Sequence, residues 1–304
     1  PEPTIADGSL YFDTKLYTGN GSTQTISGLN FESDFVWIKA RSSTTSHLVY
    51  DVIRGGSQYL LSNTTDAEGN QGSNKGLYAF TSDGFSVGDQ TNGNYGVNGN
   101  NITYAAWAWD AGSSTVSNTD GSITSQVRAN PSAGFSIVTY TGSSGAQTIG
   151  HGLNAAPSLI IAKSRSNTGE WPVYTSATGA GNKLYLNQTV GSAGSSNWNG
   201  TTPTSNVFSV GNSVETNTNT HTYVAYCFAP VEGYSAALSW TGNGNSDGVF
   251  VHTNFRVAWM LWKRSDGTAN WYIYDSARNT YNVVNDNLEP NTSDAENTLT
   301  SMNL

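Results

Sequence analysis

The sequence has one cysteine, few charges and no long apolar run. The single cysteine, Cys227, excludes an intramolecular disulfide framework and a zinc site built on cysteines. Only 13 Lys and Arg residues face 22 Asp and Glu residues, which gives a formal net charge of −9 at pH 7. Because scattered cations in an acidic chain do not neutralise phosphates, no nucleic-acid partner is expected. No stretch approaches the ~20 apolar residues that a membrane-spanning helix needs, so no membrane insertion is expected.

Uncharged residues supply most of the polarity. Charged residues are 12% of the 304 residues, about half the usual share, whereas glycine alone contributes 33 residues. The 10 Phe, 9 Trp and 16 Tyr residues can bury a large area, which excludes a disordered chain. Cys227 lies between Tyr226 and Phe228 and is interpreted as a small buried apolar residue. The chain begins Pro1-Glu2-Pro3, and either processing or a fragment boundary explains this start.

One pattern occurs three times along the chain. An aromatic residue followed by Thr and Gly recurs as Tyr17-Thr18-Gly19, Tyr140-Thr141-Gly142 and Trp240-Thr241-Gly242. A lysine follows that aromatic residue after 22, 23 and 23 residues, at Lys39, Lys163 and Lys263. A tyrosine then follows each lysine after 11 residues, at Tyr50, Tyr174 and Tyr274. Constant spacing across variable loops establishes an internal repeat.

Later landmarks divide the chain. The segment Thr103–Trp109 closes the first copy and Thr222–Phe228 closes the second, whereas the third copy has no such segment. The predicted division is repeat 1 with an N-terminal extension (1–110), a Ser/Thr/Gly-rich connector (111–134), repeat 2 (135–234) and a partial repeat 3 (235–304). Within the connector, one short strand is predicted at Ile123–Val127.

The local pattern predicts an all-β chain of tandem β-sandwich repeats, with the third repeat incomplete. Short runs rich in Val, Ile, Thr, Tyr and Trp alternate with clusters of Gly, Ser, Asn and Asp that favour turns. In Thr103–Trp109 the small residues fall on one face and large residues on the other. This alternation is typical of a strand packed against a second sheet.

The connector and two aromatic strands resemble a known family. The matching segments are Asp110–Ser113, Asn118–Ser125, Val127–Pro131, Gly134–Val138, Tyr223–Phe228 and Trp271–Asp275. They are similar to a family of repeated β domains of unassigned function, found in virion proteins of tailed bacteriophages, especially marine ones. The resemblance implies jelly-roll or concanavalin-like sandwiches and a tail-fibre-like or other structural role on the virion surface. It implies no catalytic residues.

Motifs for catalysis are missing from the sequence. The four histidines, His47, His151, His221 and His252, are far apart and form no H-E-x-x-H pattern. No G-x-S-x-G, P-loop or G-x-G-x-x-G motif occurs. The chain is therefore expected to be non-enzymatic, with no catalytic residue, no cofactor and no metal. A glycan depolymerase remains a further alternative, because paired carboxylates cannot be located in a sandwich from sequence.

Cations and acids recur at equivalent positions of the repeats. Six of the 13 cations follow the repeated strand end: Lys39, Arg41, Lys163, Arg165, Lys263 and Arg264. Either they pair there with an acid or a carbonyl, or they form a ligand-binding row with one site in each repeat. Asp51 and Asp275 are equivalent, as are Glu68 and Glu296, which favours structural roles for these acids.

Two aromatic residues lie in loops rich in Gly and Asn. Tyr95 lies in Gly93–Gly96, and Trp198 lies between Asn197 and Asn199. Exposed aromatic rings beside amides could stack on sugars, or the same rings could pack against a neighbouring unit. The resemblance to the phage family implies a virion structural protein of a tail fibre or head decoration, which is expected to form homo-oligomers and to contact other virion proteins or host-surface glycans. A carbohydrate-binding adhesin or lectin module is the main alternative.

Overall fold

A computed structural model of the chain describes residues 3–88, 96–280 and 282–303. Its regular structure consists of strands, with one short 3₁₀ turn, η1 (Gly8–Leu10). The strands are β1 (Phe12–Thr18), β2 (Gln24–Ile26), β3 (Phe35–Ala40), β4 (Leu48–Asp51), β5 (Gln58–Leu61), β6 (Gly69–Asn70), β7 (Gly76–Thr81), β8 (Gly84–Gly88), β9 (Thr103–Trp109), β10 (Thr115–Asn118), β11 (Ser125–Asn130), β12 (Phe135–Thr141), β13 (Gln147–Gly150), β14 (Leu159–Ser164), β15 (Pro172–Thr175), β16 (Asn182–Tyr185), β17 (Ala193–Gly194), β18 (Val207–Val210), β19 (Thr222–Phe228), β20 (Trp259–Lys263), β21 (Trp271–Asp275), β22 (Val284–Asn287) and β23 (Asn297–Met302). The predicted all-β class is confirmed.

Repeats 1 and 2 share one antiparallel topology. In repeat 1 the main sheet has the order β1-β9-β3-β4-β5-β6, and a smaller sheet has the order β2-β8-β7. In repeat 2 the corresponding orders are β12-β19-β14-β15-β16-β17 and β13-β18. The closing strand, β9 or β19, lies between the opening strand and the strand that carries the repeated lysine. Each closing strand is therefore central to its sheet.

The connector contributes more structure than the sequence predicted. Instead of one short strand at Ile123–Val127, it forms β10 and all of β11, and β11 pairs with β12 along its whole length. The two strands extend the main sheet of repeat 2 to eight strands. Arg128 of β11 also forms a 2.7 Å ion pair with Asp34, which is fully buried beside β3. The segment therefore fastens repeat 2 to repeat 1.

The central strands of the main sheets, β3 and β9 in repeat 1 and β14 and β19 in repeat 2, are buried on both faces. In repeat 1 the small face of β9, with Ala106 and Ala108, packs inside the sandwich with Val36 and Ile38. The large face, which includes Trp107, joins a second core built from all three repeats. The alternation of small and large residues in β9 therefore separates a core within the sandwich from a core between repeats.

In the described residues of the third repeat there are four strands, β20 to β23. The pair β20-β21 and the pair β22-β23 match β3-β4 and β5-β6, and a bridge joins Ile273 to Leu288 as Val49 pairs with Leu60. The opening motif at Trp240 forms no strand, and residues 238–250 are exposed. In the part of repeat 1 that the structure describes, β1 pairs with its closing strand β9 alone, so an opening segment without such a neighbour has no ladder to join.

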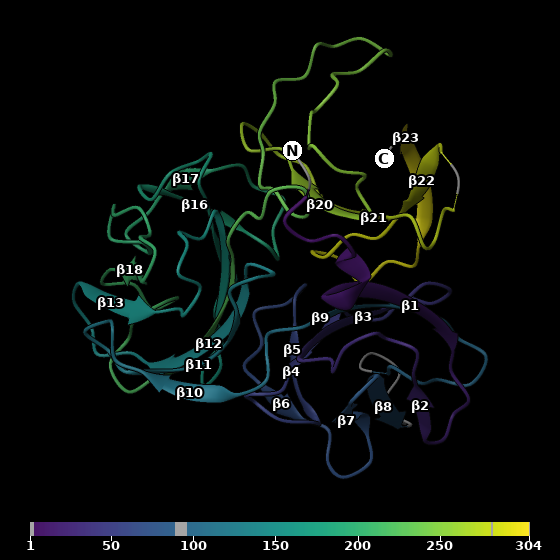
Figure 1. Ribbon diagram of the computed structural model, residues 1–304, viewed down its shortest axis with the longest axis horizontal. Helices are drawn as coiled ribbons and strands as arrows, with labels where there is room; N and C mark the ends of the chain where they lie inside the picture. Colours follow the sequence, from purple (N-terminus) through teal and green to yellow (C-terminus); the bar gives the residue numbers. More distant parts are fainter. Residues whose placement is uncertain (1–2, 89–95, 281, 304) are drawn as a thin grey trace.

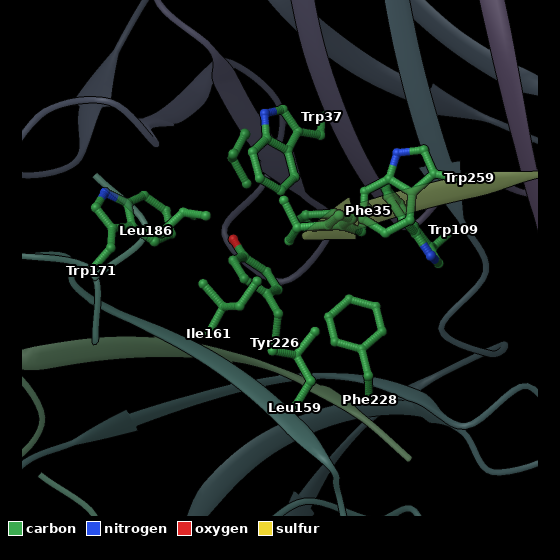
Figure 2. Close-up of a pocket in the computed structure, with 12 residues that line it drawn as sticks. Phe35, Trp37, Trp109, Leu159, Ile161, Trp171, Leu186, Tyr226, Phe228 and Trp259 are labelled. Atoms are coloured by element: carbon green, nitrogen blue, oxygen red, sulfur yellow. The ribbon is translucent and has the colours of Figure 1, made fainter. Parts of the chain in front are cut away.

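The three repeats lie around a common centre (Figure 1). Repeat 1 is drawn in purple and blue and repeat 2 in teal, and the yellow strands β20 to β23 lie above repeat 1. Figure 2 shows side chains from all three repeats pointing toward one another at this centre, among them Trp37, Tyr226 and Trp259. They leave a void of about 10 Å³, no larger than a water molecule requires, with a wholly apolar lining. This centre is a packed core and not a ligand cavity.

Candidate functional site

Three corresponding contacts, here called joints, connect the repeats in a ring. At each joint the end of the lysine-bearing strand lies against the loop that follows β5, β16 or β22 of another repeat. Joint 2–1 sets β14 against residues 65–68, joint 1–3 sets β3 against residues 293–296, and joint 3–2 sets β20 against residues 189–192. Because this order closes on itself, the repeats surround a pseudo-threefold axis.

Joint 2–1 is built on a paired arginine and lysine. The Arg165 guanidinium donates two 2.9 Å hydrogen bonds to the two carboxylate oxygens of Glu68. The Glu68 amide donates back to the Arg165 carbonyl at 2.8 Å. Lys163, which is fully buried, donates from Nζ to the Thr65 carbonyl at 3.2 Å. Two-point recognition of a carboxylate fixes the relative position of the two repeats.

Joint 1–3 repeats the arginine–glutamate geometry, whereas its lysine contacts carbonyls of its own repeat. Arg41 contacts Glu296 through Nε and Nη2 at 2.7–3.0 Å, and the Glu296 amide donates to the Arg41 carbonyl at 2.8 Å. Lys39 is fully buried and donates to the carbonyls of Ala40 and Ser43 at 2.8 and 3.3 Å. Two residues 255 positions apart thus occupy the places of Arg165 and Glu68.

Joint 3–2 keeps the backbone contacts but not the ion pair. Lys263 donates to the Thr189 carbonyl at 3.1 Å, and the Ser192 amide donates to the Ser265 carbonyl at 2.7 Å. Ser265 stands where the other joints have arginine, and Ser192 stands where they have glutamate. Arg264 pairs instead with Asp266 on the surface, where both side chains are more than half exposed. This joint is therefore the least strongly connected of the three.

Behind the first two joints lie two matching buried clusters. In repeat 1, Arg54 contacts Asp51 at 2.5 Å and Glu68 at 3.1 Å, and the side chains of Arg54 and Asp51 are completely buried. The Tyr226 hydroxyl of repeat 2 donates to Asp51 at 2.8 Å. Burial alone would lower the pKa of Arg54, but attraction from Asp51, Tyr226 and Glu68 raises it above its ordinary value. Arg54 therefore stays charged inside the protein.

The second cluster belongs to repeat 3. Arg278 contacts Asp275 at 2.6 Å and Glu296 at 3.0 Å, again with Arg278 and Asp275 completely buried. The acceptor Oδ2 of Asp275 receives a 2.9 Å hydrogen bond from the Trp107 indole of repeat 1. Trp107 and Tyr226 occupy the same position of their closing strands. Each cluster thus takes one donor from the closing strand of a neighbouring repeat.

Ring nitrogens make a third set of equivalent contacts. Trp171 of repeat 2 donates to the Leu61 carbonyl at 2.9 Å, and Trp271 of repeat 3 donates to the Tyr185 carbonyl at 2.7 Å. His47 holds this position in repeat 1, where it accepts from the Trp37 indole at 3.0 Å. Burial and then the charges of Lys39 and Arg278 lower the pKa of His47 well below its usual value. His47 is therefore neutral and part of the packing.

Burial also shifts the joint lysines toward neutrality. Burial lowers the pKa of Lys39 and of Lys163 to about 8 each. Nearby carboxylates act in the opposite direction, Asp294 and Glu296 on Lys39 and Asp66 and Glu170 on Lys163. Burial also lowers the pKa of Lys263, with a further contribution from Arg264. The joints thus hold lysines that lose part of their charge in mildly alkaline solution.

This property predicts stability that rises with pH between about 8 and 9.5. In that window the unfolded chain, with lysines near pKa 10.5, binds more protons than the folded chain, so the free energy of unfolding increases with pH. The expected slope is at most about 1.4 kcal/mol per pH unit for each lysine. Urea denaturation followed by circular dichroism at pH 7.5, 8.5 and 9.5 measures it. The double variant Lys39→Met, Lys163→Met should lose most of the slope, because only the lowered pKa of Lys263 remains.

The control for this measurement is Lys15, which pairs with Asp13 at 2.7 Å near the surface. Lys15→Met should leave the pH dependence unchanged. A free energy of unfolding that stays flat or falls between pH 8 and 9.5 in the unsubstituted protein would contradict the prediction. From about pH 9 this trend is opposed by Cys227, because burial raises the pKa of its thiol. Above pH 10 Tyr50 and Tyr226 oppose it as well, because burial raises the pKa of each hydroxyl and makes its ionisation unfavourable in the folded state.

The predicted glycan-contact loop is not a stacking platform. Trp198 is 1% exposed and packs in the core of repeat 2, with its ring 6.0 Å from that of Tyr174, so the expectation that it is exposed is wrong. Asn197 is also 1% exposed, and its amide donates to Glu215 at 2.7 Å. Asn199 alone of the three is exposed. Tyr95 lies outside the described residues.

The site includes residues that sequence reasoning did not select. Arg54 and Arg278 form the centres of the two clusters, and Trp107 and Tyr226 supply their cross-repeat donors. The motif Asp-x-x-Arg occurs at residues 51–54 and 275–278 and could have identified the two clusters from the sequence. Repeat 2 has Thr175 and Thr178 at the corresponding positions instead. The partnership with the closing strands had no signal, since it joins positions up to 175 residues apart.

The acidic side chains of the site are paired with cations and have structural roles. Asp51 and Glu68 are bridged by Arg54, and the Asp51 side chain has no exposed surface. In repeat 2 the largely buried Glu215 contacts Lys183 at 3.0 Å and accepts a 2.5 Å hydrogen bond from the Tyr185 hydroxyl. Across the described residues, no group of three or more His, Cys, Asp or Glu side chains could hold a metal ion. In the same residues no helix is long and apolar enough to cross a membrane.

Comparison with known proteins gives one match. Neither a curated protein nor a solved structure matches the chain. One family model matches residues 7–304, and thus the three repeats and the joints together. The chain belongs to the family described as a domain of unknown function, DUF7483.

Proposed function

We propose that this chain is a non-enzymatic structural component of a bacteriophage virion, in a tail fibre or a head decoration. The proposal places it on the outer surface of the particle, as a homo-oligomer in contact with other virion proteins. The resemblance of the connector string, Asp110 to Val138, to repeated β domains of tailed-phage virion proteins supports this assignment. The uncharged, cysteine-poor and β-rich composition is compatible with it.

The observation that carries a structural role is the use of the charged residues. The recurring side chains that could perform acid–base chemistry are Asp51, Glu68, Asp275 and Glu296, and all four are held by buried arginines. Four of the six recurring cations, Arg41, Lys163, Arg165 and Lys263, likewise contact carbonyls or carboxylates of another repeat at the joints. These groups keep the repeats in fixed relative positions. A rigid scaffold of this kind presents its loops to other molecules without chemical change.

Loops of this scaffold are the proposed contact surfaces for sister subunits or host-surface glycans. They carry mostly amides, hydroxyls and glycine, which suit protein packing or neutral sugars more than charged partners. A lectin site centred on Trp198 is not proposed, because the ring is buried in repeat 2. Asn199 remains an exposed loop amide that such contacts could use.

Mass spectrometry of purified virions tests the proposal. In density-purified particles of a tailed phage that encodes this chain, its peptides should occur at a constant ratio to the major capsid protein. Labelled antibodies should then mark intact particles at the tail or on the head, which separates the two locations. Absence from purified particles, with presence in infected cells, would refute a virion role.

A further inference from the structure

Strand β20 has a free edge where its two counterparts have a partner. β3 lies between β9 and β4, and β14 lies between β19 and β15, but within the described residues β20 pairs only with β21. Every residue of β3 is buried, whereas every residue of β20 is partly exposed. The edge therefore lacks the neighbour that the closing strand provides in repeats 1 and 2.

A cleft of about 1560 Å³ lies along this edge. Its walls include Trp259 and Leu261 of β20, Phe228 of repeat 2, and Trp240 of the irregular opening segment. Trp259 and Leu261 already pack against the core between the repeats, so the cleft continues that established interface outward. The indole nitrogens of Trp259 and Trp262, both lining the cleft, are buried without a hydrogen-bond partner in the described structure.

The cleft is also lined by the residue that corresponds, in repeat 2, to the acceptors Asp51 and Asp275 of the other repeats. The closing strand of repeat 2 donates from Tyr226 to Asp51, and that of repeat 1 donates from Trp107 to Asp275. The equivalent residue of repeat 2 is Thr175, and it lines the cleft together with Thr178. The pseudo-threefold arrangement therefore provides a place for a third closing strand between β20 and Thr175.

We propose that the free edge of β20 is a strand-acceptor site. It takes one antiparallel β-strand with the closing pattern, supplied by a polypeptide segment outside residues 1–304. The pattern is the one shared by β9 and β19, with large residues alternating with tyrosine or small residues. A strand of seven residues spans roughly 23 Å and gains its affinity from backbone pairing, with side-chain pockets providing specificity.

A second copy of the chain is a poorer donor for this site. Its own closing strands are central, each paired on both sides, so donating one would require opening a main sheet. The register expected for the added strand follows from the counterparts. The Arg41 amide donates to Thr103 at 2.7 Å, and the Arg165 amide donates to Thr222 at 2.8 Å, so the Ser265 amide should donate to the first residue of the added strand.

A synthetic peptide tests the proposal on the chain as it stands. The probe has the sequence of residues 219–230 with Cys227→Ser, carries a fluorophore, and is titrated against the chain by anisotropy. The control peptide has the same composition, scrambled so that the large residues fall on both faces. We expect saturable one-to-one binding of the probe, little binding of the control, and amide exchange at residues 259–265 slowed at least tenfold.

Matched variants test the register. Ser265→Pro removes the amide expected to donate to the added strand and should weaken binding at least threefold, whereas Ser265→Ala keeps that amide and should bind as the unsubstituted chain does. Absence of probe binding, equal binding of the scrambled peptide, or protection at another sheet edge would overturn the proposal. Self-association through this edge without uptake of the probe would also overturn it. The outcome does not depend on whether the chain is found in virions.

Discussion

Replacing Asp51 by threonine should destabilise the protein by about 3–5 kcal/mol, because it leaves the Arg54 guanidinium charged and buried without its nearest partner. The side chains of Asp51 and Arg54 have no exposed surface, so water cannot replace the lost carboxylate. Glu68 remains within 3.1 Å of Arg54, but Arg165 already shares it. The free energy of unfolding in urea, followed by circular dichroism, measures the loss.

Repeat 2 supplies the matched variant for this prediction. It has Thr175 and Thr178 at the positions of Asp51 and Arg54, with their hydroxyls 3.0 Å apart. The double variant Asp51→Thr, Arg54→Thr copies that arrangement and should lose only about 1–3 kcal/mol, less than the single variant. Asp13→Thr, which removes a partly exposed partner of Lys15, should cost under about 1 kcal/mol. A double variant as unstable as the single one would show that the unpaired charge is not the cause.

The constant spacings of the sequence were sufficient to predict the framework of each repeat. The interval of 11 residues from lysine to tyrosine places Lys39, Lys163 and Lys263 at corresponding strand ends and Tyr50, Tyr174 and Tyr274 in the following strand. Period-two alternation in Thr103–Trp109 likewise predicted a strand packed against a second sheet, and the structure buries both of its faces. Such features are local, since each depends on residues close together in the chain.

Contacts between segments far apart in the chain were not predictable, because they depend on how the folded sheets pack. The composition around Trp198 is typical of an exposed loop, yet core residues of repeat 2 cover its ring. The Trp240 motif matches Tyr17 and Tyr140 but forms no strand, because strand formation there requires a closing neighbour. The local composition of a segment indicates its preference for a turn, but it does not predict which sheet covers that turn in the folded protein.

The stability of the protein is also expected to depend strongly on Trp107, which contacts distant partners at the centre of the molecule. Its ring is fully buried, lies edge-on to Trp37 at 6.1 Å and parallel to His47 at 6.4 Å, and donates to Asp275. Trp107→Ala should cost about 3–5 kcal/mol through the cavity it leaves. Circular dichroism in urea is the suitable probe, because nine tryptophans share the fluorescence.

Substitutions that copy repeat 2 separate the packing of Trp107 from its hydrogen bond. Tyr226 occupies the same position there and donates through its hydroxyl to a buried aspartate, so Trp107→Tyr should retain a donor for Asp275, whereas Trp107→Phe should not. Hydrogen bonds to charged groups contribute about 1.5–3 kcal/mol, and the phenylalanine variant should be less stable than the tyrosine variant by that amount. Tyr226→Phe should show a similar loss at Asp51. Equal stability of the Trp107→Tyr and Trp107→Phe variants would mean that the donor contributes nothing and that ring volume alone holds repeat 1 against repeat 3.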